Sequence, residues 1–149
     1  MKKTNEIIIL KDVSKHYFLG EEIIKAVDKI NITINKGDFI AIIGPSGSGK
    51  STMMNLIGAL DIVTNGSIFI DNFNIEKLSE SELALLRGKK IGFVFQTFNL
   101  IPTLTALENV MLPMVFQNIP YYDREKIAIK LLEEFGLKER LSHLPNELS

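Results

Sequence analysis

The sequence of 149 residues contains no cysteine, which excludes disulfide bonds and thiolate metal sites. It also contains no stretch near the roughly 18 apolar residues that a transmembrane helix needs. The apolar run at residues 7–10 follows a basic start but is too short for the hydrophobic region of a signal peptide. From these absences we expect neither a disulfide framework nor a membrane-spanning helix.

Charge of one sign is not in excess either, since 17 Lys and Arg residues balance 18 Asp and Glu residues and the net charge is −1. Such a balance provides no broad positive surface for a nucleic-acid partner. His16 and His143 stand alone, without the carboxylate or cysteine spacing of a metal site. With 46% hydrophobic and 23% charged residues, the composition is that of a globular domain with its own core.

Short apolar segments predict strands in the first part of the chain. The expected strands include residues 7–10 and residues 29–35, and the alternating isoleucines of the second are typical of a half-buried antiparallel strand. A third strand is expected over residues 67–75, bent by a turn near Asp71 and Asn72. After residue 96 the hydrophobic period becomes helical.

Two further segments, at residues 39–44 and 91–95, are apolar without alternation. This pattern is typical of strands that are buried on both faces. A glycine-rich loop follows the first segment, and residues 50–60 then predict a helix. Strand, glycine-rich loop and helix in this order are the expected surroundings of a phosphate-binding site.

Capping boxes predict where two helices begin. Ser79 with Glu82 should open a short helix, and Thr105 with Glu108 should open another. Pro113 should kink or end the second of these helices, because proline lacks the backbone N–H and its ring clashes with the preceding turn.

A last helix is expected within residues 123–136, with Asp123 as its N-cap and Gly136 as its C-cap. One face of this helix should be apolar and turned toward a core. The residues of that face are Ile127, Leu131, Leu132 and Phe135.

Residues 44–52, GPSGSGKST, match the phosphate-loop pattern G-x-x-x-x-G-K-[ST]. Glycine lets the backbone N–H groups approach triphosphate oxygens, and the positive end of the following helix points at the anion. Lys50 supplies a mobile cation for the β- and γ-phosphates, and the Ser51 hydroxyl is a ligand for Mg²⁺. The expected nucleotide-binding residues are Gly44, Pro45, Ser46, Gly47, Ser48, Gly49, Lys50, Ser51 and Thr52.

Other motif interpretations fail on position. Thr52 stands where a dinucleotide-binding fingerprint needs a third glycine or an alanine. Residues 35–38, NKGD, resemble a guanine-specificity pattern but precede the phosphate loop, so we expect a turn there. A nucleotide kinase would need an arginine-rich lid, whereas the arginines are scattered at Arg87, Arg124 and Arg140.

The chain resembles, essentially end to end, the nucleotide-binding subunit of an ABC transporter, in particular the family that serves lipoprotein-release and macrolide- or peptide-export systems. The similarity runs from LKDVSKHYFLGEEIIKAV through GPSGSGKSTMMNLIGALD to IGFVFQTFNLIPTLTALENVMLP. The last segment is the most family-specific. The resemblance implies an α/β fold, with an N-terminal antiparallel β subdomain and RecA-like P-loop core over residues 1–96, and the Q-loop and start of a helical subdomain over residues 97–149.

The same resemblance implies roles for residues that no local pattern identifies. Tyr17 matches the aromatic that stacks on adenine, although simple packing in a strand is its alternative explanation. Gln96 matches the Q-loop glutamine, which reaches Mg²⁺ and the γ-phosphate. Phe98, Leu100 and Ile101 are candidate residues of a groove that receives a transmembrane partner, and internal packing is the alternative for each.

The implied cofactors are ATP and Mg²⁺, with Ser51 and Gln96 as the metal ligands in this chain. The implied partners are a transmembrane permease subunit, bound near Gln96, and a second copy of the domain in a homodimer. The resemblance places such a subunit in the cytoplasm, peripherally on the inner face of the membrane. It implies ATP-driven export or extraction of a substrate that the sequence does not name.

The resemblance also implies elements that these 149 residues do not contain: the signature LSGGQ, the Walker B aspartate with its catalytic glutamate, and the switch histidine. Leu148 and Ser149 match the first two letters of the signature, so we expect an interrupted domain without catalytic residues. Alone, it should bind Mg-ATP weakly without turnover and be marginally stable, because residues 39–44 would have an unpaired edge. The alternative is a non-catalytic, truncated scaffold protein.

Overall fold

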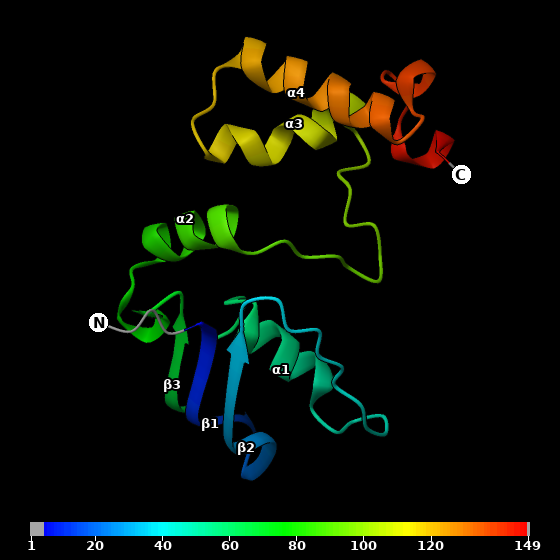
Figure 1. Cartoon of the computed structure of the whole chain (residues 1–149). Coiled ribbons are helices and arrows are strands. Elements are labelled where there is room, and N and C mark those ends of the chain that lie inside the picture. Colours follow the sequence, from blue (N-terminus) through cyan, green and yellow to red (C-terminus); the bar gives the residue numbers. More distant parts are fainter. Residues whose placement is uncertain (1–4, 149) are drawn as a thin grey trace. The chain divides into compact units, whose positions relative to one another are not determined.

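The structure, a computed structural model, describes residues 5–148. The chain divides into two compact units, Met1–Ile91 and Gly92–Ser149 (Figure 1). The expected division at residue 96 remains a prediction. Ser149, which we matched to the family signature, lies outside the described residues.

The first unit contains an antiparallel sheet with the strand order β2-β1-β3-β4 (Figure 1). Strands β1 (Glu6–Leu19) and β2 (Glu22–Asn35) form a hairpin whose turn includes Gly20, with a φ of 62°. Glycine adopts this left-handed conformation without a steric cost. The two predicted strands at residues 7–10 and 29–35 are confirmed, each as part of a longer strand.

Strand β3 (Asn65–Ile70) pairs with β1, and the short β4 (Phe73–Asn74) pairs with β3. Asp71 and Asn72 connect β3 to β4 with φ values of 50° and 69°. Asx residues tolerate this conformation better than most, so the predicted turn is confirmed with its mechanism.

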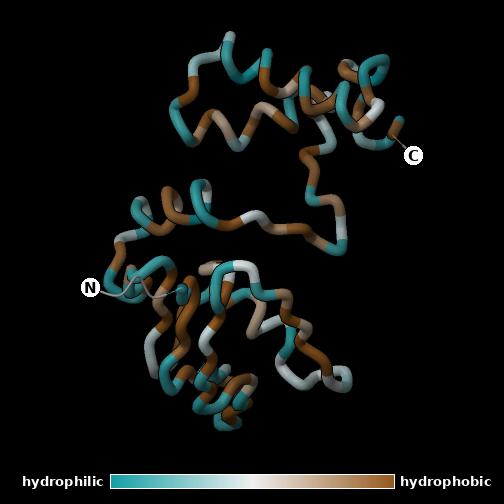
Figure 2. The backbone as a smooth tube through the Cα atoms, viewed as in Figure 1, coloured by the Kyte–Doolittle hydropathy of each residue, from teal (hydrophilic) through white to brown (hydrophobic). Residues whose placement is uncertain are grey.

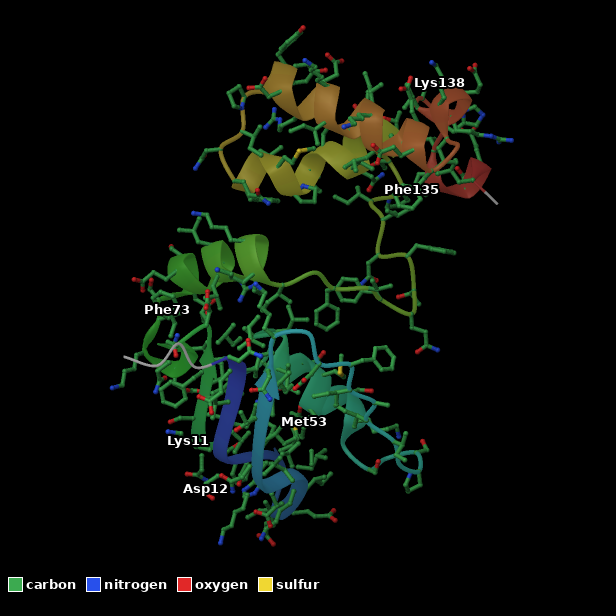
Figure 3. The ribbon with its side chains drawn as sticks, viewed as in Figure 1. Lys11, Asp12, Met53, Phe73, Phe135 and Lys138 are labelled. Atoms are coloured by element: carbon green, nitrogen blue, oxygen red, sulfur yellow. The ribbon has the colours of Figure 1, made fainter. Side chains whose placement is uncertain are left out.

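Helix α1 (Lys50–Ile57) packs against the sheet and contributes to the core of this unit. Met53, labelled in Figure 3, and Leu56 are the buried residues of this helix. They lie three residues apart, which places them on one helical face. The core cluster of this unit is Leu10, Val13, Val27, Met53, Leu56, Ala59, Ile68, Ile70 and Ile75.

A 3-10 turn, η1 (Ile75–Lys77), leads to α2 (Glu80–Lys90). The capping box predicted at Ser79 is present: the Glu82 carboxylate accepts from the Ser79 N–H at 2.8 Å, and the Ser79 hydroxyl accepts from the Glu82 N–H at 3.4 Å. The predicted start of this helix is therefore confirmed.

The two strands predicted at residues 39–44 and 91–95 are wrong for this structure, since neither segment is a hydrogen-bonded strand. Figure 2 shows in brown the apolar residues that suggested them. A strand needs a neighbour that supplies N–H and C=O partners, and the described residues provide none for these segments. Phe39 is 99% exposed and Val94 is 95% exposed, so the expected burial on both faces is also absent.

The second unit contains α3 (Ala106–Phe116) and α4 (Tyr121–Glu134), followed by the 3-10 turns η2 (Lys138–Arg140) and η3 (Pro145–Glu147). The capping box predicted at Thr105 is confirmed. Pro113 does not end α3, which continues for three residues beyond it.

The backbone groups at both ends of α3 have hydrogen-bond partners, which offsets the loss of the bond that Pro113 does not donate. At its C-terminus Asn118 adopts a φ of 57° and donates its N–H to the Val115 carbonyl at 3.0 Å. The next N–H, from Ile119, donates to the Met114 carbonyl at 3.2 Å. This pair of bonds closes the helix in a Schellman arrangement.

Helix α4 begins earlier than predicted, with Pro120 rather than Asp123 at the N-cap. Asp123 lies in the first turn, where a negative charge is favourable at the positive helix end. The C-cap is Phe135 rather than the predicted Gly136, which lies one residue later with a φ of 74°, in the left-handed conformation that favours glycine after a helix.

The predicted apolar face of α4 is largely wrong. Its buried residues are Ala128 and Leu132, whereas Ile127 and Leu131 are each 41% exposed and Phe135 is 80% exposed. Ala128 and Leu132 lie four positions apart, which places them on one face of the helix. Large apolar side chains therefore lie on the exposed side of this helix.

Candidate nucleotide-binding site

The phosphate loop, residues 44–52, is folded around the Lys50 side chain. The Lys50 ammonium donates to the carbonyl oxygens of Gly44 at 2.9 Å and of Pro45 at 2.6 Å. Within the same loop, the Ser48 N–H donates to the Pro45 carbonyl at 3.3 Å. The lysine thus bridges the beginning of the loop to the helix that follows it.

Gly49 fixes the loop against the sheet. It is the N-cap of α1, with a φ of 86° that favours glycine. A Cβ atom at this position would lie against the Ala26 carbonyl of β2, well inside van der Waals contact. Glycine is therefore required here both for its conformation and for the close approach of the loop to β2.

The backbone N–H groups in the first turn of a helix such as α1 have no partner within the helix. The N-cap Gly49 has no side chain to satisfy them, and no acidic residue lies in the first turn. Ser46, Gly47, Ser48 and Ser51 are exposed around this end of the helix. An anion is stabilised at such a terminus by the N–H groups and by the helix dipole. The geometry fits the phosphates of a nucleotide, with the Ser51 hydroxyl free to contact a cation.

Strand register relates Tyr17 to the phosphate loop within the first unit. Tyr17 of β1 pairs with Ile24 of β2, two residues before Ala26, whose carbonyl faces Gly49. Two residues of strand span about 7 Å and neighbouring strands lie about 5 Å apart, so Tyr17 lies on the order of 10 Å from the loop. This span is comparable with the separation of base and phosphates in a nucleotide.

The Tyr17 side chain is held by two residues that sequence reasoning missed. Its hydroxyl donates to the Asp61 carboxylate at 3.1 Å, and the Lys15 ammonium lies 5.2 Å from its ring centroid. Lys15 also pairs with Asp61 at 2.6 Å. No short motif links these positions, because 44 residues separate Tyr17 from Asp61.

Hydrogen bonding lowers the pKa of the Asp61 carboxyl below its usual value. Partial burial alone would raise this pKa, but the Lys15 ammonium, the Ile62 N–H and the Tyr17 hydroxyl together favour the carboxylate. Asp61 is therefore an anion at neutral pH, and the three side chains form one charge-assisted cluster.

Gln96 belongs to the second unit, whereas the phosphate loop and Tyr17 belong to the first. Gln96 is exposed. It lies between α2 and α3 in residues 92–104, which we call the Gln96 segment. The candidate partner residues Phe98, Leu100 and Ile101 are exposed as well, Phe98 by 90%. Their availability at a surface is a necessary condition for the groove that we predicted.

The Gln96 segment is anchored at its C-terminal end by Asn109 of α3. The Asn109 carboxamide accepts from the Ile101 N–H at 2.9 Å and donates to the Ile101 carbonyl at 3.1 Å. It also donates to the carbonyls of Leu104 at 2.8 Å and Thr105 at 3.0 Å. The Asn109 side chain therefore holds the backbone of the residues that lead into α3.

Two negative findings apply to the part of the chain that the structure describes. Residues 5–148 contain no group of three or more His, Cys, Asp or Glu residues arranged to hold a metal ion. Among the same residues, no helix has both the length and the apolar character that crossing a bilayer requires.

Comparison with known proteins is consistent with this geometry. Residues 27–149 match the family model described as ABC transporter. An ABC transporter ATP-binding protein of Methanocaldococcus jannaschii is 51% identical over 147 residues, which cover 96% of this chain and 63% of that protein. The lipoprotein-releasing system ATP-binding protein LolD of Legionella pneumophila is 44% identical over 146 residues, covering 97% of this chain and 64% of LolD. A macrolide export protein, MacB, is also similar.

A solved structure agrees with the fold. The dimeric ATP-binding cassette MJ0796, in a post-hydrolysis state bound to ADP and phosphate, matches with a TM-score of 0.85 and 49% identity. The match covers 96% of this chain and 63% of the cassette, so the chain spans less than two thirds of this neighbour. The likeness confirms the predicted α/β P-loop fold. The chain belongs to the ABC transporter family, among the ATP-binding proteins that include LolD and MacB.

Proposed function

We propose that the protein is the nucleotide-binding subunit of an ABC transporter, in which ATP binding and hydrolysis drive the export or extraction of a substrate. The observation that carries this proposal is the phosphate loop, closed by Lys50 on the Gly44 and Pro45 carbonyls at the N-terminus of α1. The loop presents a cation and unpaired N–H groups to the same small volume, which suits a triphosphate.

Residues 44–52 would hold the phosphates of ATP. The Lys50 ammonium would exchange its two carbonyl acceptors for the β- and γ-phosphate oxygens, an exchange that strengthens its bonds because the new acceptors are charged. Tyr17 would stack on the adenine, since its side chain is 40% exposed and its ring offers a flat apolar surface.

The residues present also fit Mg²⁺ as the accompanying cofactor. Mg²⁺ prefers oxygen ligands and usually keeps several waters and substrate phosphates, so it does not need a cluster of carboxylates from the protein. When bound, it neutralises the charge of the β- and γ-phosphate oxygens. The Ser51 hydroxyl in the first turn of α1 would be one ligand, and the Gln96 carboxamide another.

We further propose two protein partners. A second copy of the chain's domain would complete a homodimer, by analogy with the dimeric cassette that this chain resembles. A transmembrane permease subunit would bind near Gln96, at the exposed apolar residues Phe98, Leu100 and Ile101. Such a partnership would place the protein peripherally on the cytoplasmic face of a membrane.

Calorimetric titration with Mg-ATP tests the binding site. We expect the Lys50→Ala variant to lose at least about tenfold in affinity, because a charge-assisted bond to phosphate is removed. Unchanged affinity in Lys50→Ala would overturn the role of the phosphate loop.

Hydrolysis needs a separate measurement. The 149 residues contain none of the family's acidic catalytic motifs, so we predict that they bind Mg-ATP without turning it over. Phosphate release by the 149-residue protein, above background and absent in Lys50→Ala, would contradict this prediction and leave the binding proposal intact.

A further inference from the structure

Lys15, Tyr17 and Asp61 form a cluster that joins two separate parts of the first unit. Lys15 and Tyr17 lie on β1, and Asp61 follows α1 by four residues. Asp61 uses both carboxylate oxygens: Oδ1 accepts from Lys15 at 2.6 Å and from its neighbour Ile62 N–H at 2.7 Å, and Oδ2 accepts from Tyr17 at 3.1 Å. Every oxygen of the carboxylate is therefore engaged.

The Lys15 side chain is held as firmly as Asp61. Its ammonium donates to the Asp61 carboxylate and to the Ile62 carbonyl at 2.8 Å, and the side chain is only 14% exposed. The ammonium also lies within cation–π distance of the Tyr17 ring. Asp61 and Lys15 thus restrain the hydroxyl and the ring of one tyrosine at the same time.

Restraint matters for an aromatic that binds a base. A free tyrosine near the end of a hairpin loses rotamer entropy when a ligand stacks on it, and a tyrosine that is already oriented loses less. The ring also keeps exposed surface, so the restraint does not close it to a ligand. The cluster therefore prepares Tyr17 for stacking before the nucleotide arrives.

Asp61 also links the base side of the site to the phosphate side. Helix α1 begins at the phosphate loop, and the chain returns from its C-terminus directly to Asp61. The contact between Asp61 and Tyr17 ties β1 to this returning segment. Base and phosphate contacts are consequently built on one continuous piece of chain, residues 44–61, with Tyr17 attached to it.

We propose that Asp61 is a positioning residue for the nucleotide base, which orients Tyr17 directly and through Lys15. This inference rests on the proposed role of Tyr17 in ATP binding. Asp61 does not touch the phosphates in this scheme, so its loss should weaken the recognition of the base and leave the recognition of the phosphate chain unchanged.

The test compares ATP with inorganic tripolyphosphate, which has the phosphates but no base. Both are titrated against the purified 149-residue protein in the presence of Mg²⁺. We expect Asp61→Ala to lower the affinity for ATP by about fivefold to tenfold and the affinity for tripolyphosphate by less than about twofold. An equal loss for both ligands would mean that Asp61 only supports the fold of the phosphate loop, and would overturn the inference.

Two milder variants keep the test decisive if Asp61→Ala folds poorly. Asp61→Asn retains the shape of the side chain but removes the charge that holds Lys15. Tyr17→Phe retains the ring but removes the hydroxyl from which Asp61 accepts a hydrogen bond. Each should lower ATP affinity by about threefold, again without an effect on tripolyphosphate. The double variant Tyr17→Phe/Asp61→Asn should lose less than the product of the two single losses, because both act through one contact.

Asp71→Asn is the matched control. Asp71 also forms an ion pair in the first unit, with Lys90 at 2.6 Å, and asparagine suits its positive φ. This variant should bind both ligands like the wild type.

Tyr17→Ala separates the two hypotheses: if it does not lower ATP affinity relative to tripolyphosphate, the proposed adenine contact is wrong. If Tyr17→Ala has that effect and the Asp61 variants do not, only the positioning role is wrong.

Discussion

The phosphate loop and the Gln96 segment are both identified by sequence, but they are held in different ways. The loop is closed by Lys50 on two of its own carbonyls and pressed against β2 at Gly49. The Gln96 segment forms no helix or hydrogen-bonded strand among its described residues and is mostly exposed, and Asn109 anchors its C-terminal end.

The difference lies in how much of each region is held. Lys50 closes the phosphate loop on acceptors five and six residues away, and Gly49 lies against Ala26 of β2. In the Gln96 segment, Val94 and Phe98 are almost fully exposed. The phosphate loop is therefore preformed by contacts within its own unit, whereas the contacts described for the Gln96 segment hold its C-terminal end.

The largest expected difference in stability between the two regions comes from replacing one glycine by alanine in each. Gly49→Ala should destabilise the first unit by about 3 kcal/mol, because alanine is strained at a φ of 86° and its Cβ would collide with the Ala26 carbonyl. Gly92→Ala in the Gln96 segment should change stability by less than about 0.5 kcal/mol, since nothing lies within 4 Å of the added atom. Urea unfolding measures both, and equal effects would contradict the comparison.

Asn109 provides the second test, because it is the anchor of the Gln96 segment. Asn109→Ala should destabilise the second unit by about 2 kcal/mol, since carbonyls of Ile101 and Leu104 lose their donor. Amide hydrogen exchange of residues 101–105 should accelerate, while that of residues 44–52 should not change.

Asn109→Asp is the conservative counterpart. It keeps an acceptor for the Ile101 N–H but places a negative charge against carbonyl oxygens. We expect it to be at least as destabilised as Asn109→Ala. Wild-type stability in Asn109→Asp would mean that donation by the carboxamide is not what holds the segment.

Local elements of the fold were predictable because their partners lie within one turn or loop. The capping boxes at Ser79 and Thr105, the turn at Asp71 and the glycine after α4 each depend on neighbours a few residues away. Short-range hydrogen bonding and backbone preference are sufficient for these caps and turns. The bonds of Lys50 within the phosphate loop are equally local, but the contact of Gly49 with Ala26 of β2 is not.

Features that depend on distant partners were not predictable. An apolar pattern at residues 39–44 suggested a strand, but strand formation requires a neighbour that the pattern does not specify. In α4 the buried residues are Ala128 and Leu132 rather than the bulky Ile127, because the elements that pack against a helix decide which of its faces is buried. Asp61 was not predicted for the same reason, since its contacts are with Lys15 and Tyr17 of β1, which are distant in sequence.

The two predicted Mg²⁺ ligands give a smaller, more specific contrast. Ser51→Ala should lower the affinity for Mg-ATP by about tenfold, because the hydroxyl sits on a helix that is already formed. Gln96→Ala should lower this affinity by less than about threefold, because the entropy cost of ordering the exposed segment offsets most of the free energy of the contact. Titrations with and without Mg²⁺ separate metal contacts from phosphate contacts. A larger loss in Gln96→Ala than in Ser51→Ala would mean that the segment is preformed as well.

The smallest effect concerns the capping boxes, which occur in both units and should behave alike. The Ser79 N–H and hydroxyl lower the pKa of the Glu82 carboxyl, and those of Thr105 lower the pKa of Glu108 in the same way. A carboxyl whose folded pKa is depressed stabilises the helix above its unfolded pKa of about 4.3, and this contribution is lost as the pH falls through the folded pKa. NMR titration between pH 6 and pH 2 should therefore show both first turns fraying only at the acidic end.

Removing a cap donor shows whether this pH dependence is local. Thr105→Ala removes the hydroxyl donor, so the pKa of Glu108 should rise toward its ordinary value while that of Glu82 stays unchanged. In Glu108→Gln the carboxamide oxygen still accepts from the Thr105 N–H but does not titrate, so α3 should keep its first turn in acid while α2 loses its own. If Glu108 instead titrates like an unstructured glutamate in the wild type, the cap beside the Gln96 segment is as loosely held as the segment itself, and the preformed part of the chain ends before α3.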